Sequence, residues 1–402
     1  MIPEIGNWFR DWKSGWAGPA TLLVLSSLWL LMIGTIFVYS AADGPENGFP
    51  GAYSASHMKK ILVGIAGLLF VSMVPPKRIE RVSVFFYCGT LALLVMLLVW
   101  KGIEGGVVRW IRIGGFGLQP SELAKISTVM VIAYALRPGK QLDRWSNLIK
   151  IALMALIPYA LIASQPDLGT ALILVPTVAA MIWVAGVQWK KLAALAMILM
   201  VLAGFSWPTM HDYQQQRILS YLGIGSLAVE SAGGYQVAQS IIAMGSGGPT
   251  GKGLHLGSHH DLGYLPEDHN DFIFSVIGEE WGLVGTISVL IGTLVLILTM
   301  LGVAWSCRDP FGRLVSVGLA AQIGCQAAVN QAMTVGLVPV TGLPLPLISY
   351  GGTSIVATLL AIGIVISIAR NPVEVVHPDG LQKGVSPVKH RPIRATISKQ
   401  QA

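Results

Sequence analysis

The sequence predicts an all-α polytopic membrane protein with ten transmembrane helices and a large extracytoplasmic loop between spans seven and eight. The chain of 402 residues is 53% hydrophobic and only 12% charged, which is about half the charge of an average soluble domain. Apolar runs of about 20 residues recur along it, and each is long enough to cross a bilayer as a helix. The alternating ten-residue pattern of a membrane β-barrel does not occur. Helical spans are therefore the fold class that remains.

The expected spans follow one another closely, except where one long polar stretch separates them. A cytoplasmic leader at 1–17 precedes a transmembrane domain at 18–370, whose large outer loop covers 209–272. The tail at 371–402 has no apolar periodicity, so we expect it to be cytoplasmic and disordered. The ten spans lie near 18–40, 59–76, 82–100, 121–137, 148–164, 168–187, 191–208, 273–305, 314–337 and 346–370.

The distribution of basic residues predicts the orientation. An even number of spans places both termini on the same side of the membrane. With the termini inside, 19 of the 27 lysines and arginines fall in cytoplasmic segments and 8 fall outside. Because basic residues concentrate on the cytoplasmic side, both termini are expected in the cytoplasm and the 209–272 loop outside. The net charge of +7 then reflects cytoplasmic loops, and no nucleic-acid partner is expected.

Two helix boundaries carry clear signals. Pro120 is typical of a first helical position, and Glu122 places negative charge in the first turn, so a helix should begin there. Pro166 interrupts the apolar stretch between the fifth and sixth spans. Gln165 and Asp167 are therefore expected at an outer hairpin.

The eighth and tenth spans are unusual. As one helix, 272–305 would be about 51 Å long, against a hydrocarbon core of about 30 Å. Its first turns should stand above the membrane, with Glu279 and Glu280 at the interface and Asp271 at the outer tip. The run at 344–352 contains two prolines and two glycines. Irregular backbone there must face protein or a wet cavity rather than lipid.

The outer loop holds the candidate catalytic group. Titratable residues gathered in one non-cytoplasmic loop of an otherwise apolar chain indicate that chemistry takes place there. Asp271 immediately precedes a predicted helix, so it is expected to be an N-cap. A helix N-terminus favours the charged carboxylate. Such a carboxylate can also accept a proton from a bound hydroxyl.

Basic residues near the fourth span suggest an anion site. Arg109, Arg112 and Lys125 are all expected outside, against the usual bias, which favours a phosphate cradle. Glu122 and Lys125 are three residues apart and should share a helix face. The alternative is an interfacial connector anchored by Trp110 and followed by a capped helix.

Three further patterns leave alternatives open. The run at 245–253 resembles a nucleotide loop but lacks its required residues, so a flexible turn after an amphipathic stretch is the simpler interpretation. Lys252 can still contact a phosphate. His255 and His259 have i,i+4 spacing in Gly-rich sequence, and no metal site is expected. Amide side chains in the ninth span are typical of helix packing in membranes. They are Gln322, Gln326, Asn330 and Gln331.

Seven stretches, in order along the chain, resemble the SEDS family (shape, elongation, division and sporulation). They cover nearly the whole of 18–370, and the 211–217 run favours the RodA-like elongation branch over the FtsW-like division branch. Asp268 and Asn270 depart from the family, which often has Arg and Thr there. The stretches are 109–110 with 119–125, 165–170, 211–217, 245–248 with 251–253, 265–267 with 271–274, 278–280 and 344–352.

The resemblance implies a peptidoglycan glycosyltransferase of the bacterial inner membrane. Its substrate would be lipid II, the undecaprenyl-diphosphate-linked disaccharide pentapeptide. Membrane lipid would surround it, and a class B penicillin-binding protein transpeptidase would be its partner. The family's essential aspartate falls on Asp271. No cofactor is implied with certainty, and assistance by a divalent cation stays open.

The expected mechanism makes Asp271 a general base for the 4-hydroxyl of the incoming sugar, with lipid diphosphate as leaving group. Positive charge directed at that leaving group would stabilise the transition state. The cations proposed for this role are Arg109, Lys125, Arg217 and Lys252. The carboxylates expected to support them are Glu122, Glu267 and Glu280. A lipid II flippase and a scaffold that only recruits partners are the rival interpretations, and neither would make polymer.

Overall fold

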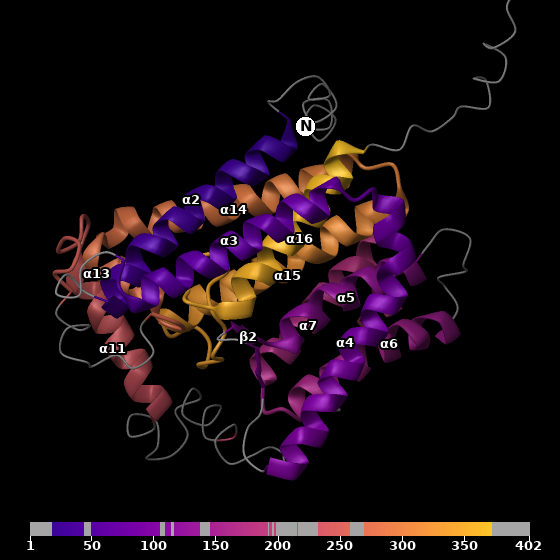
Figure 1. Ribbon diagram of the computed structural model, residues 1–402, viewed down its shortest axis with the longest axis horizontal. Coiled ribbons are helices and arrows are strands. Elements are labelled where there is room, and N and C mark those ends of the chain that lie inside the picture. The colour runs from indigo at the N-terminus through magenta and orange to yellow at the C-terminus, as the bar shows by residue number, and fades with distance from the viewer. Residues whose placement is uncertain are drawn as a thin grey trace, which may run out of the picture.

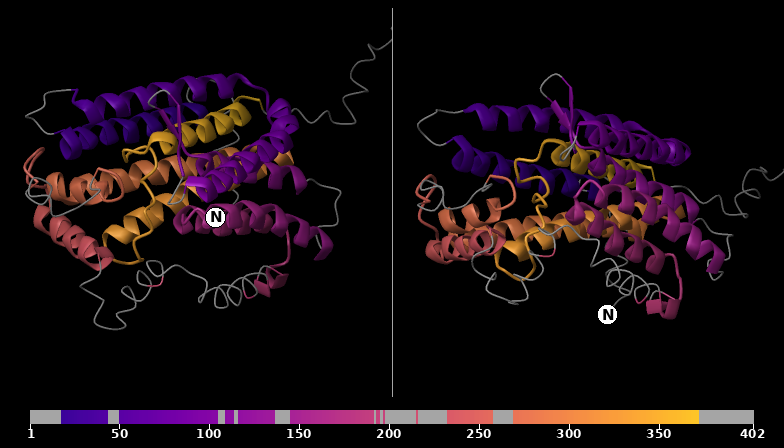
Figure 2. Two further views of the ribbon diagram at one scale, coloured as in Figure 1. Left: turned by 60° about the horizontal axis from the view of Figure 1, so that its bottom comes forward. Right: turned by 90° about the horizontal axis from the view of Figure 1, so that it is seen from below.

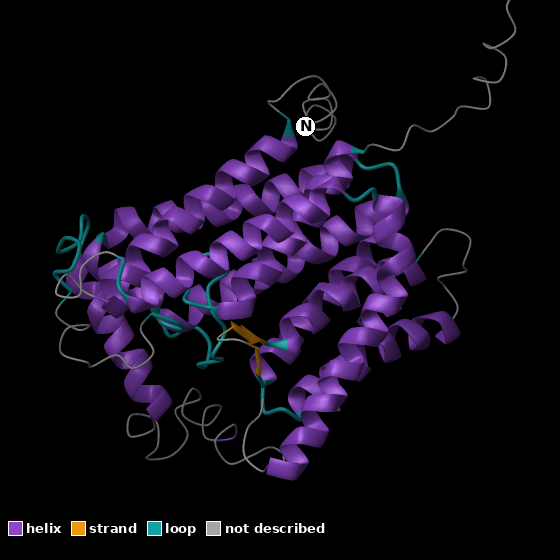
Figure 3. Cartoon of the chain, in the orientation of Figure 1, coloured by secondary structure: helices purple, strands orange, loops and turns teal. Residues whose placement is uncertain are grey.

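The computed structural model describes residues 18–43, 50–104, 109–113, 116–136, 145–191, 193–194, 197, 215, 232–257 and 269–371. The predicted leader, most of the predicted span at 191–208 and all of the tail after residue 371 lie outside these ranges. Figure 3 shows that helices make up most of the described chain, with one short strand pair among them.

The helices follow the predicted order (Figure 1). Six of the described helices are long and apolar enough to cross a membrane, and α7 is a shorter apolar helix. The helical membrane class is thus confirmed, while the count of ten spans stays a prediction. The elements are α2 (Pro19–Val38), η1 (Tyr39–Asp43), α3 (Ala52–Met73), α4 (Pro76–Glu104), β1 (Ile111–Ile113), β2 (Phe116–Leu118), α5 (Pro120–Ala135), α6 (Trp145–Ala163), α7 (Leu168–Val184), α11 (Ala232–Gly247), α13 (Ile273–Glu280), α14 (Gly282–Ser306), α15 (Pro310–Thr334) and α16 (Gly352–Arg370).

The long helices form one bundle. Helix α3 lies along α16, and α14 lies between α2 and α15. On the other side, α15 contacts α7, and α5 packs against α4. Figure 2 shows the same arrangement from two further directions, with α11 and α13 at one end of the bundle. The most deeply buried side chains come from the faces that these helices turn toward one another.

The β1–β2 hairpin is tied to the start of α16. Its antiparallel register pairs Arg112 with Gly117. The hydroxyl of Thr353 donates to the carbonyl of Gly117 at 2.7 Å and accepts from the backbone N–H of Gln119 at 2.8 Å. One threonine therefore fixes the segment that leads into α5 against the first turn of α16.

The predicted helix boundaries are partly confirmed. Helix α5 begins at Pro120, and the break at Pro166 separates α6 from α7. Helix α16 begins at Gly352 rather than near 346, because the preceding segment is irregular. Leu345 and Ile348 in that segment are buried. Non-helical backbone here thus contacts protein, as its prolines and glycines predict.

The eighth predicted span is two helices rather than one. Helix α13 ends at Glu280, and α14 begins at Gly282, whose φ is +62°. The 248–253 loop fits into this break, where the backbone N–H of Lys252 donates to the carbonyl of Glu279 at 3.0 Å. In the same way, the N–H of Leu283 donates to the carbonyl of Gly248 at 3.0 Å. Backbone groups that two helix ends leave without partners are thereby satisfied.

This break corrects two expectations from the sequence. Glu279 and Glu280 do not reach an interface, because their exposed fractions are only 1% and 0%. The 245–253 run is not a free turn either, since its backbone is hydrogen-bonded to both helices at the break.

Replacing Gly282 with alanine should destabilise the protein. A Cβ at this position would lie 2.6 Å from the carbonyl oxygen of Gly248, and the positive φ disfavours any side chain. We expect a loss of about 1–3 kcal/mol in the free energy of unfolding. The melting temperature in detergent measures it, with Gly89→Ala as the control, because a Cβ on Gly89 meets nothing within 4 Å. Equal melting temperatures for the two variants would contradict the account of the break.

Candidate active site

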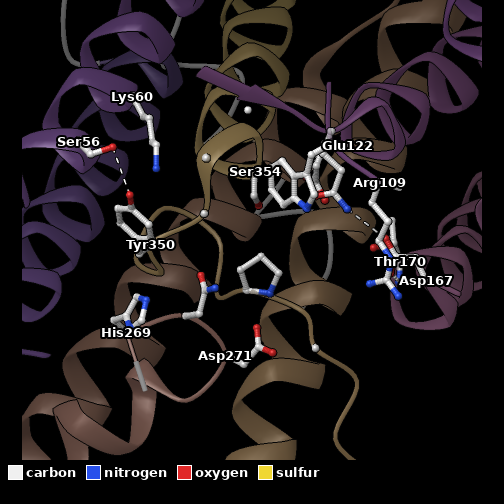
Figure 4. Close-up of a pocket in the computed structure, with 18 of the residues that line it drawn as sticks. Ser56, Lys60, Arg109, Glu122, Asp167, Thr170, His269, Asp271, Tyr350 and Ser354 are labelled. Carbon is white, nitrogen blue, oxygen red and sulfur yellow. Dashed lines mark hydrogen bonds between the residues drawn. The ribbon is translucent and has the colours of Figure 1, made fainter. Parts of the chain in front are cut away.

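A cavity of about 400 Å³ opens between α3, the hairpin, the start of α5, the α6–α7 turn and the segment before α13. Figure 4 shows its lining, with Asp271 between a group of side chains that includes Lys60 and another that includes Arg109. Its charged lining residues are Lys60, Arg109, Arg112, Glu122, Asp167 and Asp271. Three cations and three carboxylates thus face a space large enough for part of a substrate.

Asp271 lies in the turn that leads into α13. The N-cap of α13 is Phe272, which makes no side-chain capping bond. Asp271 therefore lies one residue before the N-cap and is not the N-cap that the sequence predicted. Its backbone carbonyl accepts a hydrogen bond from Nδ2 of Asn330 at 2.9 Å. The side chain of Asp271 is half-buried and lines the cavity. It lies close to Gly342, because a Cβ added to that glycine would be 3.5 Å from Oδ2 of Asp271. A partly desolvated carboxylate at this place can accept a proton from a bound hydroxyl.

One wall of the cavity carries Lys60 and Tyr350. The ammonium of Lys60 lies 3.7 Å from the centroid of the Tyr350 ring, in cation–π geometry. The Tyr350 hydroxyl donates to Oγ of Ser56 at 3.2 Å, and the ring of His269 is 5.6 Å from that of Tyr350. Sequence reasoning missed this wall. Its one available signal was that Lys60 belongs to the basic residues expected outside, as Arg109 does.

The opposite wall is built on Arg109. Its Nε donates to the carbonyl of Gln165 at 2.8 Å, and a second guanidinium nitrogen donates to the carbonyl of Pro166. Gln119 donates to Oδ2 of Asp167 at 3.1 Å, while Oδ1 of Asp167 accepts from the N–H of Thr170 as the N-cap of α7. Gln165 and Asp167 therefore lie in the turn between α6 and α7, where the sequence predicted a hairpin, and both are buried, with Asp167 lining the cavity. Arg109 holds this turn in place.

Lys125 lies behind the cavity lining rather than in it. The side chain is 0% exposed, and its ammonium is 2.9 Å from Oε1 of Glu122. It also donates to Oε1 of Gln326 at 2.7 Å. The predicted pairing across three residues is thus present, but of the two only Glu122 lines the cavity. The face of α5 that carries Lys125 points toward α15. Lys125 therefore contacts protein side chains, whereas the sequence predicted that it would contact a phosphate.

Lys252 and Glu280 are placed in a separate cluster at the α13–α14 break. The ammonium of Lys252 is 2.6 Å from Oε1 of Glu279. The Ser40 hydroxyl lies 2.7 and 2.8 Å from the two carboxylate oxygens of Glu280, and 3.2 Å from Nδ1 of His255. Lys252 and Glu280 do not belong to the cavity lining.

Two predicted site residues, Arg217 and Glu267, lie outside the described residues, as does His259. Within the ranges that the structure describes, no group of three or more His, Cys, Asp or Glu side chains is arranged to hold a metal ion. Among the described residues, the cavity therefore places the carboxylate of Asp271 between the ammonium of Lys60 and the guanidinium of Arg109. Such a site can remove a proton and stabilise an anionic leaving group.

The chain matches a family model described as "Cell cycle protein" (FTSW_RODA_SPOVE) over residues 20–373. It is 35% identical over 363 residues to the probable peptidoglycan glycosyltransferase FtsW of Geobacter metallireducens, covering 87% of this chain and 94% of that protein. It is 32% identical over 358 residues to the peptidoglycan glycosyltransferase MrdB of Escherichia coli, covering 89% of this chain and 94% of that protein.

Solved structures resemble the whole fold. The rod shape determining protein RodA of Thermus thermophilus superposes with a TM-score of 0.64 at 27% identity, covering 88% of this chain and 97% of that one. A chain from work described as "Structural coordination of polymerization and crosslinking by a peptidoglycan synthase complex" gives a TM-score of 0.72 at 28% identity, covering 88% of this chain and 98% of that one.

Proposed function

The chain belongs to the FTSW_RODA_SPOVE family of cell cycle proteins and is a peptidoglycan glycosyltransferase, and we propose that it polymerises lipid II at the cavity around Asp271. One observation carries the choice of site. Asp271 lines a cavity of about 400 Å³ in which Lys60 and Arg109 come from different elements of the fold. A carboxylate that can accept a proton and cations that can stabilise a leaving diphosphate thus face one space.

In the proposed reaction, Asp271 accepts the proton of the sugar 4-hydroxyl on the incoming lipid II. The oxygen attacks the anomeric carbon of the growing strand, and the bond to the lipid diphosphate breaks. The leaving diphosphate gains negative charge, which nearby cations stabilise. Glu122 lines the same cavity and forms an ion pair with Lys125.

Lys60 and Arg109 are the cations best placed for the diphosphate. Arg109 uses two guanidinium N–H groups on the carbonyls of Gln165 and Pro166, and a guanidinium has five donors in total. Donors therefore remain for a ligand. Lys60 presents a compact charge over the Tyr350 ring. Lys125 acts instead through the carboxylate of Glu122, because it is buried behind it.

The wider setting follows from the family and from the charge distribution. We place the protein in the bacterial inner membrane, with both termini in the cytoplasm and the cavity on the outer side, in accord with the bias of basic residues. A class B penicillin-binding protein is the proposed partner, supported by the resemblance to a chain of a polymerising and crosslinking complex. Elongation is the proposed process, on the strength of the 211–217 run and the RodA structures.

The test uses purified protein in detergent with lipid II as substrate. The protein should form glycan strands, which neither a flippase nor a scaffold would do. Lys60→Gln should lower kcat/KM by about 10-fold or more, because a charge-assisted hydrogen bond is worth about 1.5–3 kcal/mol. Lys59→Gln is the control, since Lys59 is exposed and lies outside the cavity lining. Absence of polymer from the protein, alone and with its transpeptidase, would refute the function; equal losses for the two lysines would refute the role of Lys60.

A further inference from the structure

Two amide side chains of α15 bind the backbone that surrounds the cavity. Gln326 and Asn330 are four residues apart, so they share one face of the helix, and their exposed fractions are 3% and 0%. The amide nitrogen of Asn330 donates to the carbonyl of Asp271 at 2.9 Å and to that of Leu343 at 2.7 Å. The amide nitrogen of Gln326 donates to the carbonyl of Pro344 at 2.9 Å. All three bonds therefore end on backbone segments that form the cavity.

The Asp271 carbonyl lies outside the hydrogen-bond ladder of α13. The first backbone bonds of that helix go to the carbonyl of Phe272, from Ser275 at 2.9 Å and from Val276 at 3.4 Å. A partly buried carbonyl is normally paired, and Asn330 supplies the donor. Two residues earlier, the carbonyl of His269 accepts from the N–H of Tyr350 at 3.0 Å. The turn that carries Asp271 is thus bound at both ends.

Helix packing alone does not account for Asn330. Its Oδ1 is buried and has no hydrogen-bond partner among the described residues. An unpaired buried acceptor lowers stability, so a leucine of similar size would serve better if filling space were the only need. What asparagine offers here is a pair of N–H donors directed at two backbone carbonyls, one of which belongs to Asp271.

We propose that Asn330 is a positioning residue that sets the carboxylate of Asp271 against the 342–344 loop. Gln326 supports the same loop and joins it to Glu122 through Lys125, because its Oε1 accepts from Lys125 at 2.7 Å. The two amides therefore hold the base and a second carboxylate of the cavity in one fixed frame. This inference rests on the proposed function, since it assigns Asn330 to the reaction in which Asp271 is the base.

The test replaces Asn330 with leucine, which keeps the volume and removes both donors. We expect kcat per folded enzyme to fall by about 10-fold or more, because misplacing a catalytic group by about 1 Å can cost about 10²-fold. The KM for lipid II should change by less than about threefold. The melting temperature should fall, because the carbonyls of Asp271 and Leu343 both lose their donor, and for this reason kcat is measured per folded enzyme. Gln322→Leu is the matched control: Gln322 is a buried amide of the same helix, and the described residues offer its Oε1 no partner.

Several outcomes would overturn this inference. An unchanged kcat in Asn330→Leu would do so, as would a lower melting temperature with kcat intact, or equal losses in Asn330→Leu and Gln322→Leu. If Asn330→Leu does not fold, Asn330→Ser keeps one donor and should show an intermediate kcat. A wild-type kcat in Asn330→Ser would also overturn the inference. Full activity of Asp271→Asn would remove Asp271 as the base and with it the premise of this inference, whereas absence of polymer from the wild-type protein would remove the proposed function itself. If Asp271 proves essential but Asn330→Leu keeps its activity, only the positioning role of Asn330 is removed.

Discussion

Replacing Asp271 with asparagine should lower the rate of glycan-strand formation by about 10²–10⁴-fold, the usual contribution of a general base. The exchange keeps the size of the side chain and removes its ability to accept the proton of the attacking hydroxyl. The backbone bond from Asn330 to the Asp271 carbonyl is unaffected, because it does not involve the side chain. Polymer made from lipid II by the purified protein in detergent measures the effect, and Asp271→Ala should abolish activity in the same assay.

The matched control is Asp309→Asn. Asp309 is also a carboxylate at the start of a helix, where its Oδ2 accepts from the N–H of Gly312 at 2.9 Å, but it does not line the cavity. Its replacement should cost about 1 kcal/mol of stability or less as a lost cap and leave the rate of polymerisation unchanged. A near wild-type rate in Asp271→Asn would remove Asp271 as the base, and a similar loss in both variants would point to unfolding.

The fold was predictable where the cause is local. Pro120 starts α5, and Pro166 ends the apolar run before α7, because proline acts on its own backbone. The break at Gly282 was missed, since Glu279 and Glu280 also fit the polar first turns of one long helix, and only the positive φ of Gly282 reveals the break. The partner that stabilises the break is the 248–253 loop, which lies about 30 residues earlier in the chain. A pattern read along one helix does not contain that contact.

The site was predictable to a similar degree. Titratable character and position in the chain pointed to Asp271, Arg109 and Glu122, and all three line the cavity. The three-residue spacing gave the contact between Glu122 and Lys125, but not the direction in which their helix face points. Lys60 was missed because its place over the Tyr350 ring joins residues almost 300 positions apart. Such contacts arise only when α3 packs along α16.

Lys125→Met should destabilise the protein by about 3–5 kcal/mol, because removing one partner of a buried ion pair leaves the other charge uncompensated. Lys125 and Glu122 are 0% and 3% exposed, so water cannot replace the lost ammonium. The carbonyl oxygen of Gln326 also loses its donor. Thermal unfolding in detergent and the folded fraction on size exclusion measure the loss. A wild-type melting temperature for this variant would contradict a charged pair at this site.

The double variant Glu122→Gln/Lys125→Met separates stability from catalysis. It should recover most of the lost stability, since neutral side chains of similar volume often replace a buried ion pair without cost. Its rate of polymerisation should nevertheless stay low, because Glu122 lines the cavity while Lys125 does not. Recovery of both stability and rate would mean that the pair only supports the fold. Recovery of stability alone would mean that the Glu122 carboxylate is needed in the cavity.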